Sequence, residues 1–210
     1  IVAADMLEAA ATDITFAEGQ FTVAGTDRRI GILDVAKAAR EAGTPLDTFH
    51  AFTRDAMTYP CGAHAAEVTV DQDTGVVRLV NYTAVDDYGV LVNPMVASGQ
   101  VHGAIAQGVG QALLEHAVYD EDGQLLAGSF MDYAMPRADD LPSFTLDFSP
   151  TPCTTNPLGV KGCGEAGAIA GYPAVTLAIL DALKPLDVEG WDGPATPETI
   201  WRAIQAARSA

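Results

Sequence analysis

The chain has 210 residues, a formal net charge of −17 and an isoelectric point near 4.2. Its length suits one large domain or two small ones, and a hydrophobic content of 49% is enough for a sizeable core. Phosphate binding draws on Lys and Arg, so 11 basic residues against 28 acidic ones argue against nucleic acid or an anionic membrane as a partner.

The three cysteines (Cys61, Cys153 and Cys163) are odd in number, widely spaced and outside any C-x-x-C motif. They suggest neither a disulfide framework nor a zinc site, and a reducing, cytoplasmic location is the default expectation. The longest stretch without Asp, Glu, Lys or Arg, residues 88–114, is too polar to span a membrane. The N-terminus lacks a Met and a signal-peptide pattern and reads like the second half of a helix, so we expect a piece of a longer chain.

The first half of the chain predicts two hairpins and two helices. Residues 13–24 alternate apolar and polar around AEGQ, and 63–70 and 75–85 alternate around DQDTG. Residues 32–43 have helical periodicity and a glycine stop. Residues 94–116 predict a helix that opens at Pro94. Glycines 99, 103, 108 and 110 each weaken that helix by roughly 1 kcal/mol, so something should approach its backbone closely.

The second half adds a short hairpin over 117–128 and a strand over 143–148. A proline-rich coil then leads into an apolar run, where Pro173 is expected to restart the helix that ends at Leu183. A last helix over 196–207 has Thr196 as its N-cap and Pro197 at the first position. Hairpins with interspersed helices favour an α+β fold, a mixed sheet packed with long helices.

The most unusual stretch is GVKGCGEAGAIAGYPAVTLAILDAL, residues 159–183, in which Glu165 stands where coil turns into helix. Gly162, Gly164 and Gly167 satisfy G-x-G-x-x-G, and Asp181 lies at a suitable distance for a ribose-binding acid. We reject this dinucleotide interpretation. The fingerprint requires a strand running into the first glycine, and Glu165 would compete with a pyrophosphate for the helix N-terminus.

Glu165 therefore has two remaining interpretations. A carboxylate in a first helical turn is stabilised by the helix dipole by roughly 0.3–1 kcal/mol, which is a purely structural role. The surrounding glycines, however, allow backbone to crowd a ligand, and the uncharged run over 166–180 looks buried. Burial would favour the neutral acid, whereas the dipole and Lys161 would favour the carboxylate, and such a balance suits a general base.

The glycine-containing helix offers further candidates. Gln100, Gly103 and Gln107 fall on one face at i, i+3 and i+7, where the amides could hold a polar ligand and the glycine could admit it; tight helix packing is the equal alternative. His102 has no second ligand at helical spacing, so a satisfied core histidine is favoured over a metal ligand. Cys163 as a thiol nucleophile lacks a paired base in the sequence.

Four segments together resemble a known family: residues 159–183, VHGAIAQGVGQAL (101–113), YPCGAHAAEVTVDQDTGVV (59–77) and LDVEGWDGPATPETIWRAIQ (186–205). They are similar to the C-terminal part of the large, molybdenum-binding subunit of the xanthine dehydrogenase family, most of all its aldehyde oxidase and aerobic carbon monoxide dehydrogenase branch. Residues 1–210 would then form the C-terminal portion of a molybdopterin-cofactor-binding domain, open to division into subdomains at about 1–60 and 61–210.

The resemblance implies a molybdenum hydroxylase that oxidises a carbon centre (an aldehyde, an N-heterocycle or carbon monoxide) with oxygen from water. It implies molybdenum held by a molybdopterin, often its cytosine dinucleotide, and no protein ligand to the metal. By position, Glu165 matches the active-site base and Gln107 a glutamine that contacts the cofactor. Gln100 and Gly103 would line the same helix, and Lys161, Gly162 and Gly164 would set the position of the glutamate.

The resemblance also implies partners. The remainder of the large subunit would complete the site, and iron–sulfur and flavin (FAD) subunits or domains would remove electrons, in a dimer of heterotrimers. Cys163 and Cys61 depart from the family pattern, which has small aliphatic and aromatic residues there. We expect the isolated chain to bind cofactor poorly and to be inactive. The alternative hypothesis is a non-catalytic assembly module that only packs against a partner chain.

Overall fold

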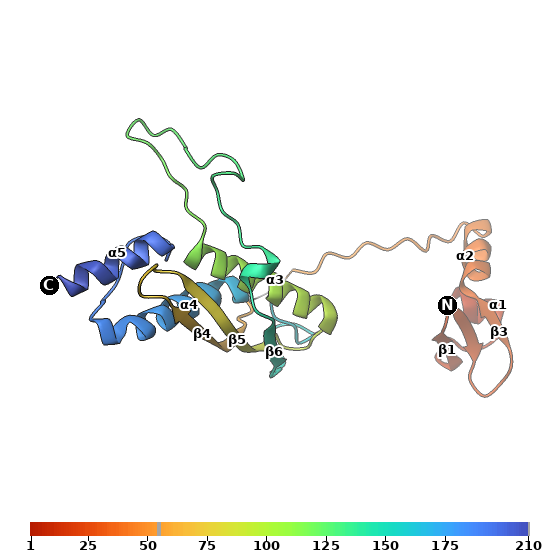
Figure 1. Ribbon diagram of the computed structural model, residues 1–210. Coiled ribbons are helices and arrows are strands. Elements are labelled where there is room, and N and C mark those ends of the chain that lie inside the picture. The colour runs from red at the N-terminus through yellow and green to blue at the C-terminus, as the bar shows by residue number, and fades with distance from the viewer. Residues whose placement is uncertain (54–55, 210) are drawn as a thin grey trace. The chain divides into compact units, whose positions relative to one another are not determined.

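The computed structural model describes residues 1–53 and 56–209, in an α+β arrangement. The chain divides into two compact units, Ile1–Thr53 and Arg54–Ala210, and each is described by itself (Figure 1). The candidate site residues all belong to the second unit.

The first unit is a small antiparallel sheet with two helices. The predicted hairpin is confirmed: β1 (Ile14–Ala17) pairs with β2 (Gln20–Val23), and a third strand that the sequence did not predict, β3 (Arg29–Gly31), pairs with β2. The predicted helix is α2 (Ile32–Glu41), and a short α1 (Val2–Met6) packs against it; η1 (Ala11–Asp13) connects α1 to the sheet. The buried apolar side chains are few: Ala3, Ala4, Leu7, Val23, Val35 and Ala39.

The second unit is built on a three-stranded sheet in the order β4-β5-β6. The second predicted hairpin is β4 (Cys61–Val70) and β5 (Val77–Asp87), which are antiparallel. Its turn is closed by Asp71, whose side-chain oxygen accepts hydrogen bonds from the backbone N–H groups of Asp73 and Thr74. The predicted strand at 143–148 is β6 (Phe144–Phe148), and it pairs with β5 in parallel.

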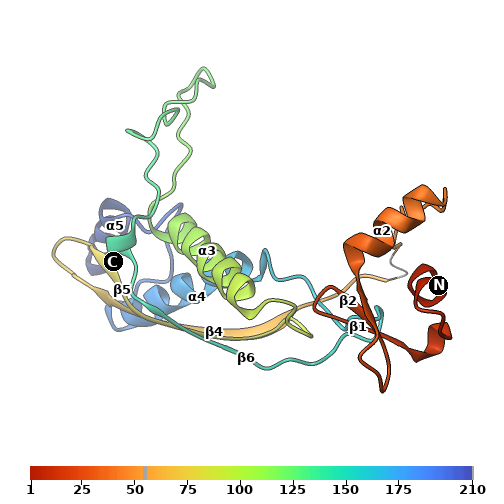
Figure 2. The ribbon, with the colours of Figure 1, turned by 90° about the vertical axis from the view of Figure 1, so that its right-hand side faces the viewer.

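Two long helices, α3 (Pro94–Leu113) and α4 (Ala166–Leu183), pack against each other on one side of this sheet (Figure 2). Asn93 caps α3 by accepting from Val96 N at 3.1 Å, and Thr196 caps α5 (Pro197–Arg208), as predicted. The turns η2 (Ala138–Asp140) and η3 (Lys184–Leu186) complete the unit. The largest fully buried side chains are Tyr82, Ile105, Ile179, Leu183, Ile200, Ile204, Val101, Val109 and Val175. Burying each contributes about 1.5–3 kcal/mol.

Two predictions about the apolar run were wrong. Pro173 does not restart a helix but lies inside the continuous α4. It sits on an exposed face, where water can satisfy the carbonyl that loses its N–H partner. Nor is the run buried all round: every fourth residue from Gly167 to Leu183 is buried, whereas Ile169 and Leu177 are 71% and 63% exposed. Together with η3, α4 is long and apolar enough to cross a membrane, but its buried face packs against α3 and β4.

The predicted hairpin over 117–128 is confirmed only in part, because the segment turns back on itself without forming two strands. Within it, Tyr119 and Leu125 form a single isolated bridge, and Asp120 closes the turn by accepting from the backbone of Asp122 and Gln124. The segment between α3 and η2 extends away from the helices (Figure 1). It contains strongly exposed apolar side chains, including Phe130 and Met131.

Candidate functional site

The seam between α3 and α4 is made by small residues. A Cβ on Gly167 would lie 2.8 Å from Ala104 Cβ and 2.9 Å from Val101 O, and a Cβ on Gly108 would lie 2.8 Å from Ala168 O. The prediction that something approaches the glycines of α3 is therefore confirmed for Gly108.

For Gly99 and Gly103, no such neighbour lies among the described residues, and the approach of a ligand or partner chain stays a prediction. A Cβ on either would meet no atom within 4 Å, so these two glycines face open space rather than a packed neighbour. Both lie on the exposed side of α3.

Glu165 stands at the start of this seam. It is the N-cap residue of α4, and its carbonyl accepts from the N–H groups of Ala168 and Ile169 at 3.0 Å each. Its side chain makes no capping hydrogen bond and is exposed. A capping role therefore does not account for the carboxylate, although its charge remains at the positive end of the helix dipole.

The predicted polar face of α3 is exposed and lies next to the loop that carries Glu165. Gln100, Gly103 and Gln107 are all exposed. The Nε2 atom of Gln100 lies 3.8 Å from the position that a Cβ would take on Gly164. Gln107 is two turns further along the helix, about 10 Å from Gln100 by helical rise. The fold thus brings Gln100 and the 162–165 loop together.

Two further candidates lie differently from expectation. His102 is not a core histidine: it is exposed, its Nδ1 lies 2.8 Å from Ser98 O, and its ring stacks on Phe144 at 5.8 Å. Cys163 is half-buried and packs against the core. Within residues 1–53 and 56–209, no three His, Cys, Asp or Glu side chains gather as a metal site would require.

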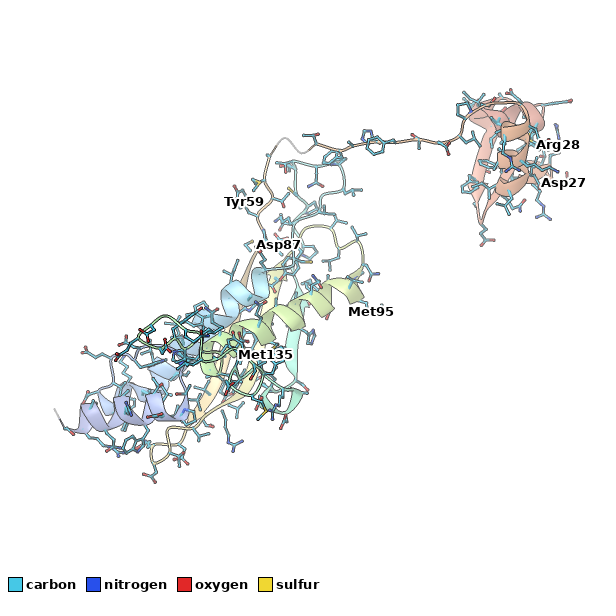
Figure 3. The ribbon with its side chains drawn as sticks, turned by 90° about the horizontal axis from the view of Figure 1, so that it is seen from above. Asp27, Arg28, Tyr59, Asp87, Met95 and Met135 are labelled. Carbon is cyan, nitrogen blue, oxygen red and sulfur yellow. The ribbon has the colours of Figure 1, made fainter. Side chains whose placement is uncertain are left out.

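The sequence analysis expected the charge of Lys161 to favour the carboxylate form of Glu165, but Lys161 pairs with Asp87 instead. Its Nζ lies 2.7 Å from Oδ2 of Asp87, with side-chain exposures of 12% and 11%. Figure 3 labels Asp87 where β5 ends. The Lys161 ammonium holds the pKa of the Asp87 carboxyl well below its usual range, helped by backbone N–H donors, and the same hydrogen bond raises the pKa of Lys161. The sequence analysis missed Asp87, because nothing local pairs it with a residue 74 positions away.

A second buried polar group was also missed. His64 on β4 lies with Nδ1 2.8 Å from Tyr82 Oη and Nε2 3.0 Å from Asp86 Oδ1, and the Tyr88 hydroxyl donates to Asp86 Oδ2 at 2.8 Å. Burial is the main cause that raises the pKa of both tyrosines, followed by the Asp86 charge for Tyr82 and by the hydrogen bond to Asp86 for Tyr88. Gly62 makes room for Asp86, because a Cβ there would lie 2.1 Å from Oδ1. Asp86 and Asp87, two consecutive aspartates at the end of an apolar strand, were the sequence feature that could have indicated this buried polar group.

A groove of about 530 Å³ opens near the C-terminal end of α3, against Val109, Leu113 and Ala195. None of the predicted site residues lines it. The candidate site is instead the open corner formed by the 162–165 loop and the exposed polar face of α3.

Known proteins share this sequence and this fold. The molybdopterin cofactor-binding domain family matches residues 1–142. The gamma subunit of the 6-hydroxypseudooxynicotine dehydrogenase complex of Paenarthrobacter nicotinovorans is 37% identical over all of this chain and 27% of its own length. The carbon monoxide dehydrogenase large chain of Hydrogenophaga pseudoflava is 31% identical over 97% of this chain and 26% of its own length.

Solved structures are similar to this chain in fold as well. Cu,Mo-CO dehydrogenase superposes with a TM-score of 0.81 at 30% identity, covering 99% of this chain and 27% of that one. Quinoline 2-oxidoreductase from Pseudomonas putida 86 superposes with a TM-score of 0.80 at 37% identity, covering 97% of this chain and 27% of that one. The chain thus spans about a quarter of the length of the relatives it matches. It belongs to the molybdopterin cofactor-binding domain family and corresponds to part of the molybdenum-binding large subunit of the xanthine dehydrogenase and aldehyde oxidase type.

Proposed function

We propose that this chain supplies the general base and one wall of the cofactor site in a molybdenum hydroxylase that acts on an aldehyde, an N-heterocycle or carbon monoxide. The observation that carries the proposal is the position of Glu165. Its carboxylate is exposed at the start of α4, makes no capping hydrogen bond, and follows directly on Gly164, which lies beside the amide of Gln100.

The open corner suits a molybdopterin by its donor set and by the open space beside two of its glycines. The pterin and phosphate groups of such a cofactor need hydrogen-bond partners, and the exposed amides of Gln100 and Gln107 can both donate and accept. Gly103 and Gly162 have no atom within 4 Å of a Cβ position, so a ligand can approach their backbones. Gln107, Gln100, Gly103, Gly162 and Gly164 would hold or frame the cofactor, in its cytosine dinucleotide form, while Lys161, paired with Asp87, would set the position of the loop.

When bound, the cofactor supplies the metal that activates water-derived oxygen and accepts electrons from the substrate. Glu165 would accept, on one of its carboxylate oxygens, the proton that the water-derived oxygen gives up. Gln107 and Gln100 would orient polar groups by hydrogen bonds. The rest of the large subunit would close the site and exclude water, which strengthens such interactions.

The proposed function requires partner subunits and places the enzyme in the cytoplasm. The remainder of the large subunit completes the site, iron–sulfur and FAD subunits carry electrons away, and two such heterotrimers associate in the cytoplasm. Relatives named as a large chain and as a subunit of a dehydrogenase complex support an assembly with other subunits. The isolated chain is then expected to be inactive.

The test is Glu165→Gln in the full large subunit within its complex. We expect molybdenum content and assembly to be retained while kcat falls by about 10²–10⁴-fold, the usual contribution of a general base. Glu189→Gln is the matched control, since Glu189 is another exposed glutamate of the same unit. Molybdenum content is measured by elemental analysis and turnover with an aldehyde, quinoline and carbon monoxide in turn.

The second candidate function is a non-catalytic assembly module. It is favoured by exposed apolar side chains at the start of α3, where Val92 and Met95 are each 79% exposed; Figure 3 labels Met95. If Glu165→Gln keeps the activity of the control variant, the assembly module is the better description.

A further inference from the structure

The Lys161–Asp87 ion pair differs from the other Lys and Arg ion pairs of the described residues. Lys37–Glu41 and Arg202–Glu198 join neighbouring turns of one helix and are 68% and 72% exposed. Lys161 and Asp87 are almost buried and join two segments far apart in sequence. A nearly buried ion pair often adds little to the free energy of unfolding, because both charges lose their hydration. The Lys161–Asp87 pair can instead orient the loop that leads into α4.

Asp87 is itself held rigidly. Its Oδ1 atom accepts from Gly89 N at 2.8 Å and Thr151 N at 2.9 Å, while Oδ2 accepts from Lys161 Nζ. One carboxylate therefore joins the turn after β5, the coil after β6 and the loop before α4.

Backbone contacts reinforce this junction. Lys161 N donates to Tyr88 O, and Val90 N donates to Gly159 O, both at 2.9 Å. Gly89 has φ +64°, and a Cβ on it would lie 2.2 Å from Gly159 O, so only glycine fits there. The loop is thus clamped to the end of the sheet at residues 159–161.

The chain is fixed again at Gly167, which packs on Val101 and Ala104 of α3. Between these two anchors lie Gly162, Cys163, Gly164, Glu165 and Ala166. Gly162 meets no atom within 4 Å of a Cβ position, and the Glu165 side chain has no capping bond. Cys163 and Ala166 also pack against the core, so the backbone that carries Glu165 is held on both sides of it, and the 159–161 anchor determines where that segment begins.

We propose that Asp87 is a positioning residue for the Glu165 base: by holding Lys161 against the end of β5, it fixes the loop that aims the glutamate at the cofactor corner. This inference rests on the proposed function of Glu165. A displacement of about 1 Å in a reacting group can reduce the rate by about 100-fold. Loss of the pair should therefore reduce turnover without removing the cofactor.

The experiment uses the full enzyme complex and four variants. Asp87→Asn keeps both backbone hydrogen bonds to Oδ1 but removes the charge that faces Lys161, and Lys161→Met removes the ammonium but keeps an unbranched side chain. We expect each to lower kcat by about 10–100-fold, with molybdenum content retained and KM changed by less than about threefold. Lys161→Arg should recover part of the kcat lost in Lys161→Met, because it restores a cation. Glu198→Gln, which breaks an exposed pair, should leave kcat unchanged.

A purely structural role is distinguished by two further measurements. Hydrogen exchange of the Lys161 and Val90 amides, which are hydrogen-bonded at this junction, should accelerate in Asp87→Asn, while that of the central residues of β4 and β5 stays unchanged. Combining Asp87→Asn with Glu165→Gln should give no loss of residual rate beyond that of Glu165→Gln alone, because Asp87 acts through Glu165.

The proposal is overturned if Asp87→Asn keeps kcat within threefold of wild type, loses its molybdenum, or lowers the residual rate of Glu165→Gln further. Failure of the proposed function has a separate signature, since full activity of Glu165→Gln by itself would remove the base whatever Asp87→Asn does.

Discussion

Gly108 on α3 and Gly171 on α4 meet backbone to backbone, and a Cβ on Gly171 would lie 3.3 Å from the Cα of Gly108. This contact sets how closely the two helices approach. It therefore fixes the distance between the exposed polar face of α3 and the start of α4, where Glu165 lies.

Gly108→Ala should destabilise the second unit. The new Cβ would lie 2.8 Å from Ala168 O and 2.9 Å from Tyr172 N, both backbone atoms, so the helices must separate. Overpacking of this kind costs about 1–3 kcal/mol, only partly offset by the better helix propensity of Ala. The free energy of unfolding from urea denaturation of the chain measures the effect.

Gly99→Ala is the matched control on the same helix. Its Cβ would meet nothing within 4 Å, so we expect unfolding free energy to be unchanged or raised by up to about 1 kcal/mol. Equal effects of the two substitutions would contradict close packing of α3 against α4 at Gly108.

The Lys161–Asp87 pair should give stability a defined pH dependence. The folded pKa of Asp87 lies below its ordinary value of 3.8. A carboxyl with a depressed folded pKa stabilises the fold above its unfolded pKa, and that contribution disappears as pH falls through the folded value. The difference in unfolding free energy between wild type and Asp87→Asn should therefore be constant from about pH 5 to neutrality and shrink below about pH 4.

The contribution of Lys161 to stability has the opposite pH dependence. Its folded pKa is raised above 10.5, so its contribution is present at neutral pH and is lost only as strongly alkaline pH passes through the folded value. Urea denaturation of wild type and Asp87→Asn across an acid pH series measures the contribution of the Asp87 carboxylate to the free energy of unfolding. A difference that grows towards low pH would contradict the ion pair.

Gln107→Leu should separate cofactor binding from folding. Gln107 is exposed, so its replacement should change the unfolding free energy by no more than about 0.5 kcal/mol. In the full complex it should lower molybdenum content or kcat, because the amide would no longer orient a polar group of the cofactor. Gln111→Leu, one turn further along the same helix and also exposed, should leave both unchanged. If Gln107→Leu and Gln111→Leu have the same molybdenum content and kcat, Gln107 does not belong to the cofactor site.

Local patterns in the sequence predicted much of the fold. Alternation around tight turns located β1–β2 and β4–β5, while Pro94 and the Thr196–Pro197 cap located the starts of α3 and α5. These features depend on neighbours a few residues apart. The short β3 escaped because three residues carry too little periodicity. The helix at Pro173 was misread because the local effect of proline is outweighed by packing of the whole α4 face on α3.

The sequence alone determined that Glu165 stands at a coil-to-helix boundary among glycines, and that Gln100, Gly103 and Gln107 share a helix face. Only the tertiary structure decided that Lys161 pairs with Asp87 and that His64 lies against Asp86. Both pairs join residues at least 22 positions apart, brought together when strands pair and helices pack. No periodicity encodes such contacts, because their partners are chosen by the geometry of the folded chain rather than by spacing along it.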